Sequence, residues 1–271
     1  MDQSDKTGLL TIQKAAALLR ALSHDMPETG IRELAEKLAV PRSTVHRMLV
    51  ALEREGFVDK DPVSGRYHLG HELIFLAGHA LRNMDVRRIA LPYMHQLGDR
   101  WKETVDLDLL RGAEVLIIEE VPGQHLLGTG GNWAKRMPAH CTSTGKVFLA
   151  YAGREYVEEH LPEVLQAYTA ATITSRQALL EQLAQVRRQG YARSWGEHSE
   201  FMHAIGVPIH DHTGSVVAAM SISGLAARMD ESIALEMIPA LQATSREISS
   251  RMGYVEGARS SVNAQGYRPN W

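Results

Sequence analysis

The sequence predicts an α+β protein with two domains. The chain has 271 residues, more than the roughly 100–200 that one domain usually takes, and 44% of them are hydrophobic, as ordinary globular cores require. The period of the hydrophobic pattern also changes along the chain. Apolar residues recur at helical spacing up to about residue 102, whereas segments with a period of two begin at Thr104. We therefore expect a helical N-terminal domain and a larger C-terminal domain that combines an antiparallel sheet with flanking helices.

Three helices and a hairpin are expected in residues 1–70. In the third helix, Val45, Leu49 and Leu52 recur at positions i, i+4 and i+7, which buries one stripe of the helix. The turn-forming residues 61–65 separate two short extended segments, as in a β-hairpin. The expected elements are helices over 9–23, 31–38 and 41–56 and strands over 57–60 and 66–69. This order of elements is typical of a winged helix-turn-helix domain.

An apolar helix is expected over 71–83, directly after the hairpin. Its side chains include Leu73, Ile74, Leu76 and Leu81, too many apolar groups for a helix that stands alone in water. We expect this helix to link the two domains and to pack against a second copy of the chain, which predicts a homodimer.

Strand and helix signals are mixed in the C-terminal part. Val105, Leu107 and Leu109 alternate with polar residues, and a turn at Arg111-Gly112 leads into a second strand. Residues 122–140 form a long irregular stretch, and loops of this length are often functional. The expected strands lie over 104–109, 115–121, 191–195, 204–209 and 215–223, and the expected helices over 85–102, 142–151, 174–189 and 230–252.

These elements divide the chain into four segments. They are a winged helix-turn-helix domain over 1–70, a linker helix over 71–84, a C-terminal domain over 85–253 and a disordered tail over 254–271. The tail is assigned to disorder because it is polar and has no hydrophobic period.

The charge and the cysteine content exclude several classes of protein. The net charge is −3, and residues 1–70 carry ten Lys/Arg and ten Asp/Glu, so any case for DNA binding rests on local arrangement. The single cysteine, Cys141, excludes an intrachain disulfide and a multi-cysteine zinc module. No apolar run approaches the roughly 20 residues of a membrane helix, and residues 1–7 lack the order of a signal peptide. We therefore expect a cytoplasmic protein without a membrane partner.

The third predicted helix has a face that suits contact with DNA. No Asp or Glu lies between Lys37 and Leu52, which allows this segment to approach phosphates. Arginine pairs bidentately with guanine, and hydroxyl groups reach phosphates or base edges. The alternative is a three-helix unit with a merely solvated polar face. The predicted DNA-contacting residues are Arg42, Ser43, Thr44, His46 and Arg47 on the helix, with Lys60 and Arg66 at the wing.

Several motifs, taken in their order along the chain, resemble those of one protein family. Two lie in the N-terminal domain, Val40-Pro41-Arg42-Ser43-Thr44-Val45-His46-Arg47 and Gly65-Arg66-Tyr67-His68-Leu69-Gly70. Three lie in the C-terminal domain, Pro138-Ala139-His140-Cys141-Thr142-Ser143-Thr144-Gly145-Lys146, Ile205-Gly206-Val207-Pro208-Ile209 and Ala218-Ala219-Met220-Ser221-Ile222-Ser223-Gly224. Together they resemble the isocitrate lyase regulator (IclR) family over about residues 9–253.

This resemblance implies a fold and a function. The C-terminal domain is expected to be a GAF-like effector domain, and the chain to be a ligand-responsive transcription regulator and not an enzyme. Members of the family repress or activate operons for the catabolism of small acids and aromatic compounds, and their dimers often pair into tetramers. The expected partners are double-stranded operator DNA, a small-molecule effector and further copies of the chain, with no cofactor.

The start of the predicted helix at 142–151 is suited to an anion. Free N–H groups and the positive end of the helix dipole favour negative charge there. Ser221 and Ser223 are two apart on a strand, so their hydroxyl groups face the same side. We therefore expect a small carboxylate or an aromatic acid, with its carboxylate at the helix start and fixed by the two serines.

The resemblance adds further residues to this site. The matching positions in the family place Ser194 and Ala204 near the effector, and the irregular stretch supplies an apolar wall. Trp133 packs equally well on the core or on a neighbouring subunit, so that alternative stays open. The predicted effector-binding residues are Trp133, Met137, Thr142, Ser143, Thr144, Gly145, Ser194, Ala204, Ser221 and Ser223.

Two other kinds of site are weaker alternatives. Cys141 beside His140 suggests a thiolate nucleophile, but sequence neighbours rarely form a working dyad and no third orienting group is evident. His198 and His203 are further metal-ligand types, yet no His-x-x-x-His pair and no CxxC motif occurs. The glycine run 128–131 lacks the Lys-Ser/Thr of a phosphate-binding loop. An interaction module without a ligand is the remaining alternative.

Overall fold

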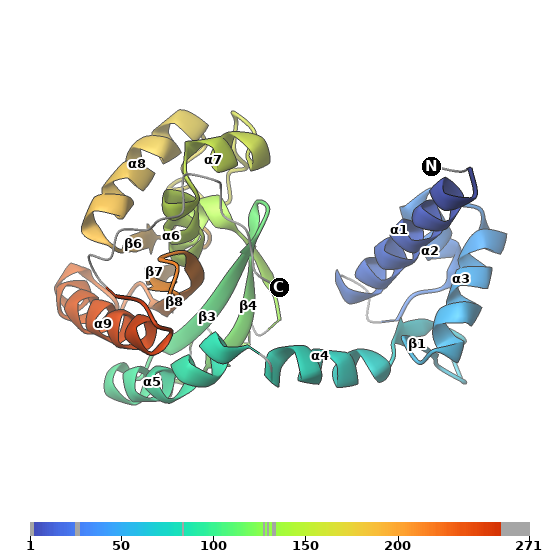
Figure 1. The fold of residues 1–271 in the computed structure, drawn as a ribbon, viewed down its shortest axis with the longest axis horizontal. Coiled ribbons are helices and arrows are strands. Elements are labelled where there is room, and N and C mark those ends of the chain that lie inside the picture. Colours follow the sequence, from blue (N-terminus) through green and yellow to red (C-terminus); the bar gives the residue numbers. More distant parts are fainter. Residues whose placement is uncertain are drawn as a thin grey trace. The chain divides into compact units, whose positions relative to one another are not determined.

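The computed structural model describes residues 3–24, 28–82, 84–126, 128, 130–131 and 134–255. The chain separates into two compact units, Met1–Asn83 and Met84–Trp271, and each is described by itself (Figure 1). Two predictions lie outside the described residues. They are the wall position of Trp133 and, from residue 256 on, the disordered tail.

The N-terminal unit is a winged helix-turn-helix, as predicted. Its elements are α1 (Gln3–His24), α2 (Ile31–Leu38), α3 (Arg42–Arg54), β1 (Val58–Lys60), β2 (Tyr67–Leu69) and α4 (Glu72–Arg82). Strands β1 and β2 pair antiparallel, with Val58 opposite Leu69. The core combines Leu18 of α1, Leu34 of α2 and Leu49 of α3, all fully buried. The first helix starts earlier than the sequence pattern suggested, because Gln3 and not residue 9 begins it.

The turn between α2 and α3 is tight. Ala39 adopts the left-handed conformation, with φ 53°, and ends α2. Pro41 lies one residue before α3, and its carbonyl oxygen accepts the backbone N–H groups of Thr44 and Val45. The turn thus sets where α3 begins and which of its residues form the first turn.

The C-terminal unit is built on one six-stranded antiparallel sheet. Its strand order is β5-β4-β3-β8-β7-β6. The strands are β3 (Thr104–Arg111), β4 (Glu114–Val121), β5 (Arg136–Pro138), β6 (Ala192–Trp195), β7 (Met202–His210) and β8 (Val216–Leu225). The helices are α5 (Asp85–Trp101), η1 (Ala139–Cys141), α6 (Ser143–Ala152), α7 (Arg154–His160), α8 (Arg176–Gln189) and α9 (Glu231–Arg251).

Helices cover both faces of this sheet. In Figure 1, α5 and α9 lie against one face, and α6 lies against the other with α7 and α8 beside it. Phe148 of α6, Leu110 of β3 and Leu179 of α8 belong to the core on the α6 side. Both sides of β3 are therefore buried, including the polar side chains Asp106 and Asp108. This confirms the predicted α+β class with an antiparallel sheet and flanking helices.

Several local features differ from the sequence-based expectation. The irregular stretch 122–140 contains the short strand β5 and the 3₁₀ turn η1, and helix α7 was not predicted. The α8 helix is capped by Ser175, whose hydroxyl accepts the N–H of Ala178, and not by Thr174. Within the described residues no helix is long and apolar enough to cross a membrane.

Candidate functional site

The predicted DNA-contacting residues of α3 lie on one accessible face of the helix. Val45, Met48 and Leu49 are buried in the core of the N-terminal unit. The opposite face carries Arg42, Ser43, His46 and Arg47, all exposed, and Thr44, which is half-buried. Two guanidinium groups and the free N–H groups of the first helical turn are therefore available to a phosphate or a base edge.

The two wing residues differ in whether their side chains already make hydrogen bonds within the protein. Lys60 is exposed at the end of β1. Arg66 is already engaged, because its guanidinium donates to Oε1 of Glu33 at 2.8 Å and to the carbonyl oxygen of Glu28 at 2.8 Å. Arg66 thus ties the wing to α2. Contact with DNA stays a prediction for all of these residues. For Arg66 it requires that the guanidinium leave Glu33, or that it bind Glu33 and DNA at the same time.

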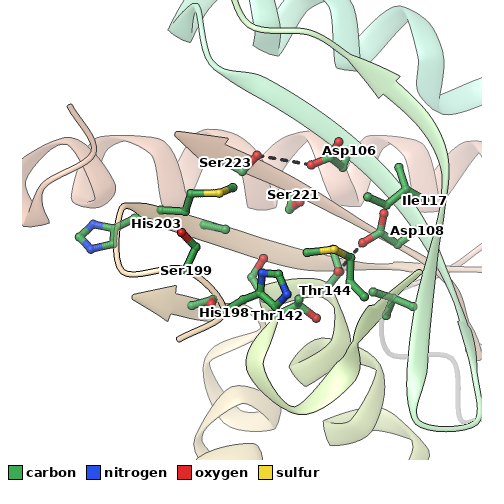
Figure 2. Close-up of a pocket in the computed structure, with 16 residues that line it drawn as sticks. Asp106, Asp108, Ile117, Thr142, Thr144, His198, Ser199, His203, Ser221 and Ser223 are labelled. Carbon is green, nitrogen blue, oxygen red and sulfur yellow. Dashed lines mark hydrogen bonds between the residues drawn. The ribbon is translucent and has the colours of Figure 1, made fainter. Parts of the chain in front are cut away.

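A cavity of about 70 Å³ lies in the C-terminal unit, where β3, β7 and β8 meet the start of α6 (Figure 2). Most of the residues that line it are polar, although they also contribute apolar atoms to its surface. The polar lining residues are Asp106, Asp108, Thr142, Ser143, Thr144, Ser194, His198, Ser199, His203, Ser221 and Ser223, and the apolar ones are Val115, Ile117, Met137, Met202 and Ala204.

Most of the predicted effector residues line this cavity. The sequence pattern and the resemblance together placed Met137, Ser194, Ala204 and the serines of β8 there. Gly145 is not in the lining. A Cβ at Gly145 would lie 2.3 Å from the carbonyl oxygen of Ala139, so the residue lets η1 and α6 pack closely. Whether the cavity binds an effector stays a prediction.

Several hydroxyl groups of the cavity donate to the protein itself. The hydroxyl of Thr142 donates to the carbonyl oxygen of Pro138 at 3.0 Å, and that of Ser194 donates to the carbonyl oxygen of Cys141 at 2.7 Å. The hydroxyl of Thr144 donates to Oδ2 of Asp108. Each hydroxyl has one proton, so these three groups offer a ligand lone pairs and not donors.

Asp106 and Asp108 are the charged site residues that sequence reasoning missed. It also missed Val115, Ile117, His198, Ser199, Met202 and His203 as lining residues. The two aspartates alternate with Val105, Leu107 and Leu109 along β3, and a period of two marks such residues as the polar face of a strand. Only the tertiary structure identifies them as site residues, because α6 covers this face of the sheet. Their side chains point into the cavity in Figure 2, at 7% and 3% exposure of the residues.

The environment of the pair raises the pKa of both carboxyl groups. For Asp106 the causes are burial first, then repulsion by Asp108 and Glu120. For Asp108 burial raises the pKa to about 7, against the hydrogen bond from Thr144. Desolvation disfavours the charged form of a carboxyl group, and a like charge nearby adds to that effect. The pair of carboxyl groups therefore remains partly protonated near neutral pH.

The suggested catalytic cysteine is unsuited to nucleophilic chemistry. Cys141 is fully buried, and burial raises the pKa of its thiol to about 12. The ring of His140 is directed to the carbonyl oxygen of Gln166, with Nε2 at 3.0 Å. The described residues contain no group of three or more His, Cys, Asp or Glu that could hold a metal ion.

Comparison with known proteins matches both units. Residues 11–62 match the IclR helix-turn-helix domain, and residues 78–250 match the C-terminal domain of the bacterial transcriptional regulator IclR. The HTH-type transcriptional regulator KdgR of Escherichia coli (strain K12) is 35% identical over 245 residues, which cover 90% of this chain and 93% of the relative. XynR of the same organism is 30% identical over 249 residues, with 90% and 97% covered.

Two solved structures extend the match to the fold. An IclR transcriptional regulator from Alicyclobacillus acidocaldarius superposes with a TM-score of 0.80 at 30% identity, covering 90% of this chain and 98% of that one. An IclR homolog from Microbacterium hydrocarbonoxydans, complexed with 4-hydroxybenzoate, gives a TM-score of 0.77 at 27% identity and covers 89% and 98%.

A winged helix-turn-helix in one unit and an effector domain in the other define a DNA-binding transcription regulator that responds to a small molecule. The chain belongs to the IclR family. These relatives are named transcriptional regulators, and this chain is a regulator and not an enzyme.

Proposed function

We propose that this regulator controls a catabolic operon in response to a small carboxylate or an aromatic acid bound in the cavity of the C-terminal unit. The observation that carries the proposal is the convergence of most of the predicted effector residues on one cavity (Figure 2). Support for an acid comes from the cavity's position at the start of α6, where the helix dipole favours a negative charge. The relative from Microbacterium hydrocarbonoxydans was solved with an aromatic acid, 4-hydroxybenzoate.

The proposed DNA-contacting residues are the exposed ones at the start of α3, together with those of the wing. Arg42 and Arg47 suit guanine or phosphate, and Ser43 and His46 suit base edges or phosphate oxygens. Lys60 and Arg66 are proposed to contact the DNA backbone from the wing.

The proposed assembly is a homodimer or a dimer of dimers that binds two operator half-sites. The apolar residues Ile74, Phe75 and Leu76 of α4 are exposed in the single chain, at 75%, 58% and 44%. These consecutive residues point in different directions, so α4 exposes apolar surface on more than one side, which suits packing against a second copy. Effector binding then changes operator affinity only if the two operator-binding states differ in effector affinity.

The DNA part of the proposal is tested with operators selected by the full-length protein from a random DNA pool. We expect Arg42→Ala and Arg47→Ala each to weaken binding by about 1–3 kcal/mol in a mobility-shift titration, because a bidentate arginine contact contributes that much. Arg154→Ala is the matched control, since Arg154 is an exposed arginine on α7 of the other unit. Full affinity in both α3 variants would reject this face as the DNA-reading surface.

A further inference from the structure

The cavity lining contains two carboxyl groups and several hydroxyl groups that donate to the protein itself. The hydroxyl protons of Thr142, Thr144 and Ser194 are used within the protein, as described above. Two carboxyl groups, Asp106 and Asp108, lie in the lining, and no lysine or arginine is among the described residues around it. The nearby ammonium group of Lys146 is paired with Glu197 at 2.5 Å and is fully buried. The lining also contains His198, whose pKa is lowered mainly by burial, and His203, but no lysine or arginine there balances the two carboxyl groups.

Each of the two carboxyl groups keeps one oxygen without a partner in the described part of the chain. These atoms are Oδ1 of Asp106 and Oδ1 of Asp108, both buried. The other oxygens accept from Ser223, at 3.4 Å, and from Thr144. A buried acceptor without a donor costs free energy, and such groups in native structures are usually explained by a role in binding or catalysis.

The strand geometry places the two carboxyl groups side by side. Asp106 and Asp108 are two residues apart on β3, so both face the same side, with their Cα atoms about 7 Å apart. Figure 2 shows both side chains directed into the cavity from this strand. One small group that carries several N–H donors can therefore contact both carboxyl groups at once.

We propose that the effector carries a protonated nitrogen, and that this group binds between Asp106 and Asp108. An ammonium group supplies a positive charge and several donors, which suit the two carboxyl oxygens that have no partner. A neutral hydroxyl group supplies a donor without the charge, and a plain carboxylate brings a third acidic group to the pair. Because the carboxylate end of the effector still fits the start of α6, the ligand class is a compact amino acid or a similar zwitterion. This inference rests on the proposed function of the cavity as the effector site.

A metal ion is a less suitable occupant than an ammonium group. Two carboxyl groups alone make a poor ligand set, since oxygen-binding cations take six or more ligands. Within the described residues no third His, Cys, Asp or Glu completes a group that could hold a metal.

The test uses sets of three probes that differ in one group. The first set is alanine, lactate and propionate, and the second is 4-(aminomethyl)benzoate, 4-(hydroxymethyl)benzoate and 4-methylbenzoate. Thermal melts of the full-length protein identify which members bind, and calorimetric titration gives their affinity. We expect the amine of at least one set to raise the melting temperature while its hydroxyl and methyl partners do not.

Two variants and one control test where the protonated nitrogen binds. Asp106→Asn and Asp108→Asn each remove one carboxyl group, and we expect each to weaken amine binding at least about tenfold. Asp99→Asn is the matched control on the exposed surface of α5, with unchanged affinity expected. If one of the two Asn variants fails to fold, the other still serves as the test.

The possible outcomes separate this inference from the proposed function. If a hydroxyl or methyl member binds better than its amine, and Ser221→Ala/Ser223→Ala abolishes that binding, the cavity is an effector site and the protonated nitrogen is rejected. If an amine binds equally well to Asp106→Asn and Asp108→Asn, its placement between the two carboxyl groups is wrong. If no amine binds, the inference is overturned for both sizes of ligand, and if no probe of any kind binds, the acid-effector proposal fails with it.

Discussion

Lys146 is a charged side chain in the core of the C-terminal unit. Its Nζ donates to Oε1 of Glu197 at 2.5 Å, and its side chain has no exposure to solvent. Burial lowers the pKa of this ammonium group, and the charge and the hydrogen bond of Glu197 oppose that effect. The pair joins α6 to the segment after β6, which also contributes His198 and Ser199 to the cavity.

The first prediction at the residue scale concerns this ion pair. Lys146→Met should lower the free energy of unfolding by about 3–5 kcal/mol, because it leaves the buried carboxylate of Glu197 without a partner. The double variant Lys146→Met/Glu197→Leu should recover most of that loss, since both charges are then absent. Guanidinium unfolding of the wild type, both single variants and the double variant measures the coupling. A loss in the double variant equal to the sum of the two single losses would show that the ion pair itself contributes nothing.

An exposed ion pair serves as the control for this cycle. Arg32 and Glu36 form a salt bridge at 3.0 Å on the surface of α2, with both side chains mostly exposed. Exposed pairs are screened by water and salt, so Arg32→Met should leave the unfolding curve unchanged within error.

Two kinds of site residue differ in how far the sequence predicts them. Ser221 and Ser223 were predicted because they lie two apart on a strand, and such residues face the same side. Asp106 and Asp108 were not, because alternation on β3 describes a strand that has one wet face. Only the packing of α6 over that face turns the same two residues into buried groups.

At the scale of elements, the turn between α2 and α3 determines the start of the proposed recognition helix. Ala39 holds a left-handed conformation, with φ 53°, in which a Cβ is disfavoured. Two backbone bonds fix the turn, from the N–H of Ala39 to the carbonyl oxygen of Glu36 and from the N–H of Val40 to that of Ala35.

The prediction for this turn is a gain in stability. Ala39→Gly should raise the free energy of unfolding of the N-terminal unit by about 0.5–1 kcal/mol, because glycine adopts this conformation without the Cβ penalty. Ala51→Gly is the matched control, since Ala51 is exposed inside α3, and it should lower that free energy by about 1 kcal/mol. Circular dichroism at 222 nm during thermal melts distinguishes the two. A loss of stability in both variants would contradict the role of this turn.

The sequence predicts long elements better than short ones. Helices α3, α8 and α9 span three turns or more, enough for a helical period to appear in the pattern. Strand β5 has three residues and is defined by its pairing with β4, where Met137 lies opposite Val115. Helix α7 has seven residues, too few for a reliable period. Such elements depend on their neighbours and not on local propensity.

At the scale of the whole molecule, the two units have separate hydrophobic cores. One core joins α1, α2, α3 and the wing, with Leu18, Leu34 and Tyr67 buried in it. The other fills the space between the sheet and α6–α8. Separate cores allow separate unfolding, since cooperative transitions follow cores and not chain connectivity.

The last prediction is therefore a thermal unfolding curve with two transitions. Two variants show which transition belongs to which unit. Ala39→Gly should move only the transition of the N-terminal unit, and Asp108→Asn only that of the C-terminal unit. The pKa of Asp108 is raised to about 7 in the folded protein, so its protonated form stabilises the fold at low pH. That contribution is complete below the ordinary pKa of 3.8 and is lost as the pH rises through about 7.

Raising the pH from 5 to 8 should thus lower the melting temperature of the C-terminal unit more in the wild type than in Asp108→Asn, by on the order of a few degrees. His198 and His210 have lowered pKa values, mainly through burial, and their contribution has the opposite sign because it is lost as the pH falls. Both histidines are present in the two proteins, so the difference between wild type and variant isolates the effect of Asp108. A single transition that both variants shift equally would mean that the two cores unfold as one cooperative unit, and the effector domain would then be coupled to the DNA-binding domain through their shared stability.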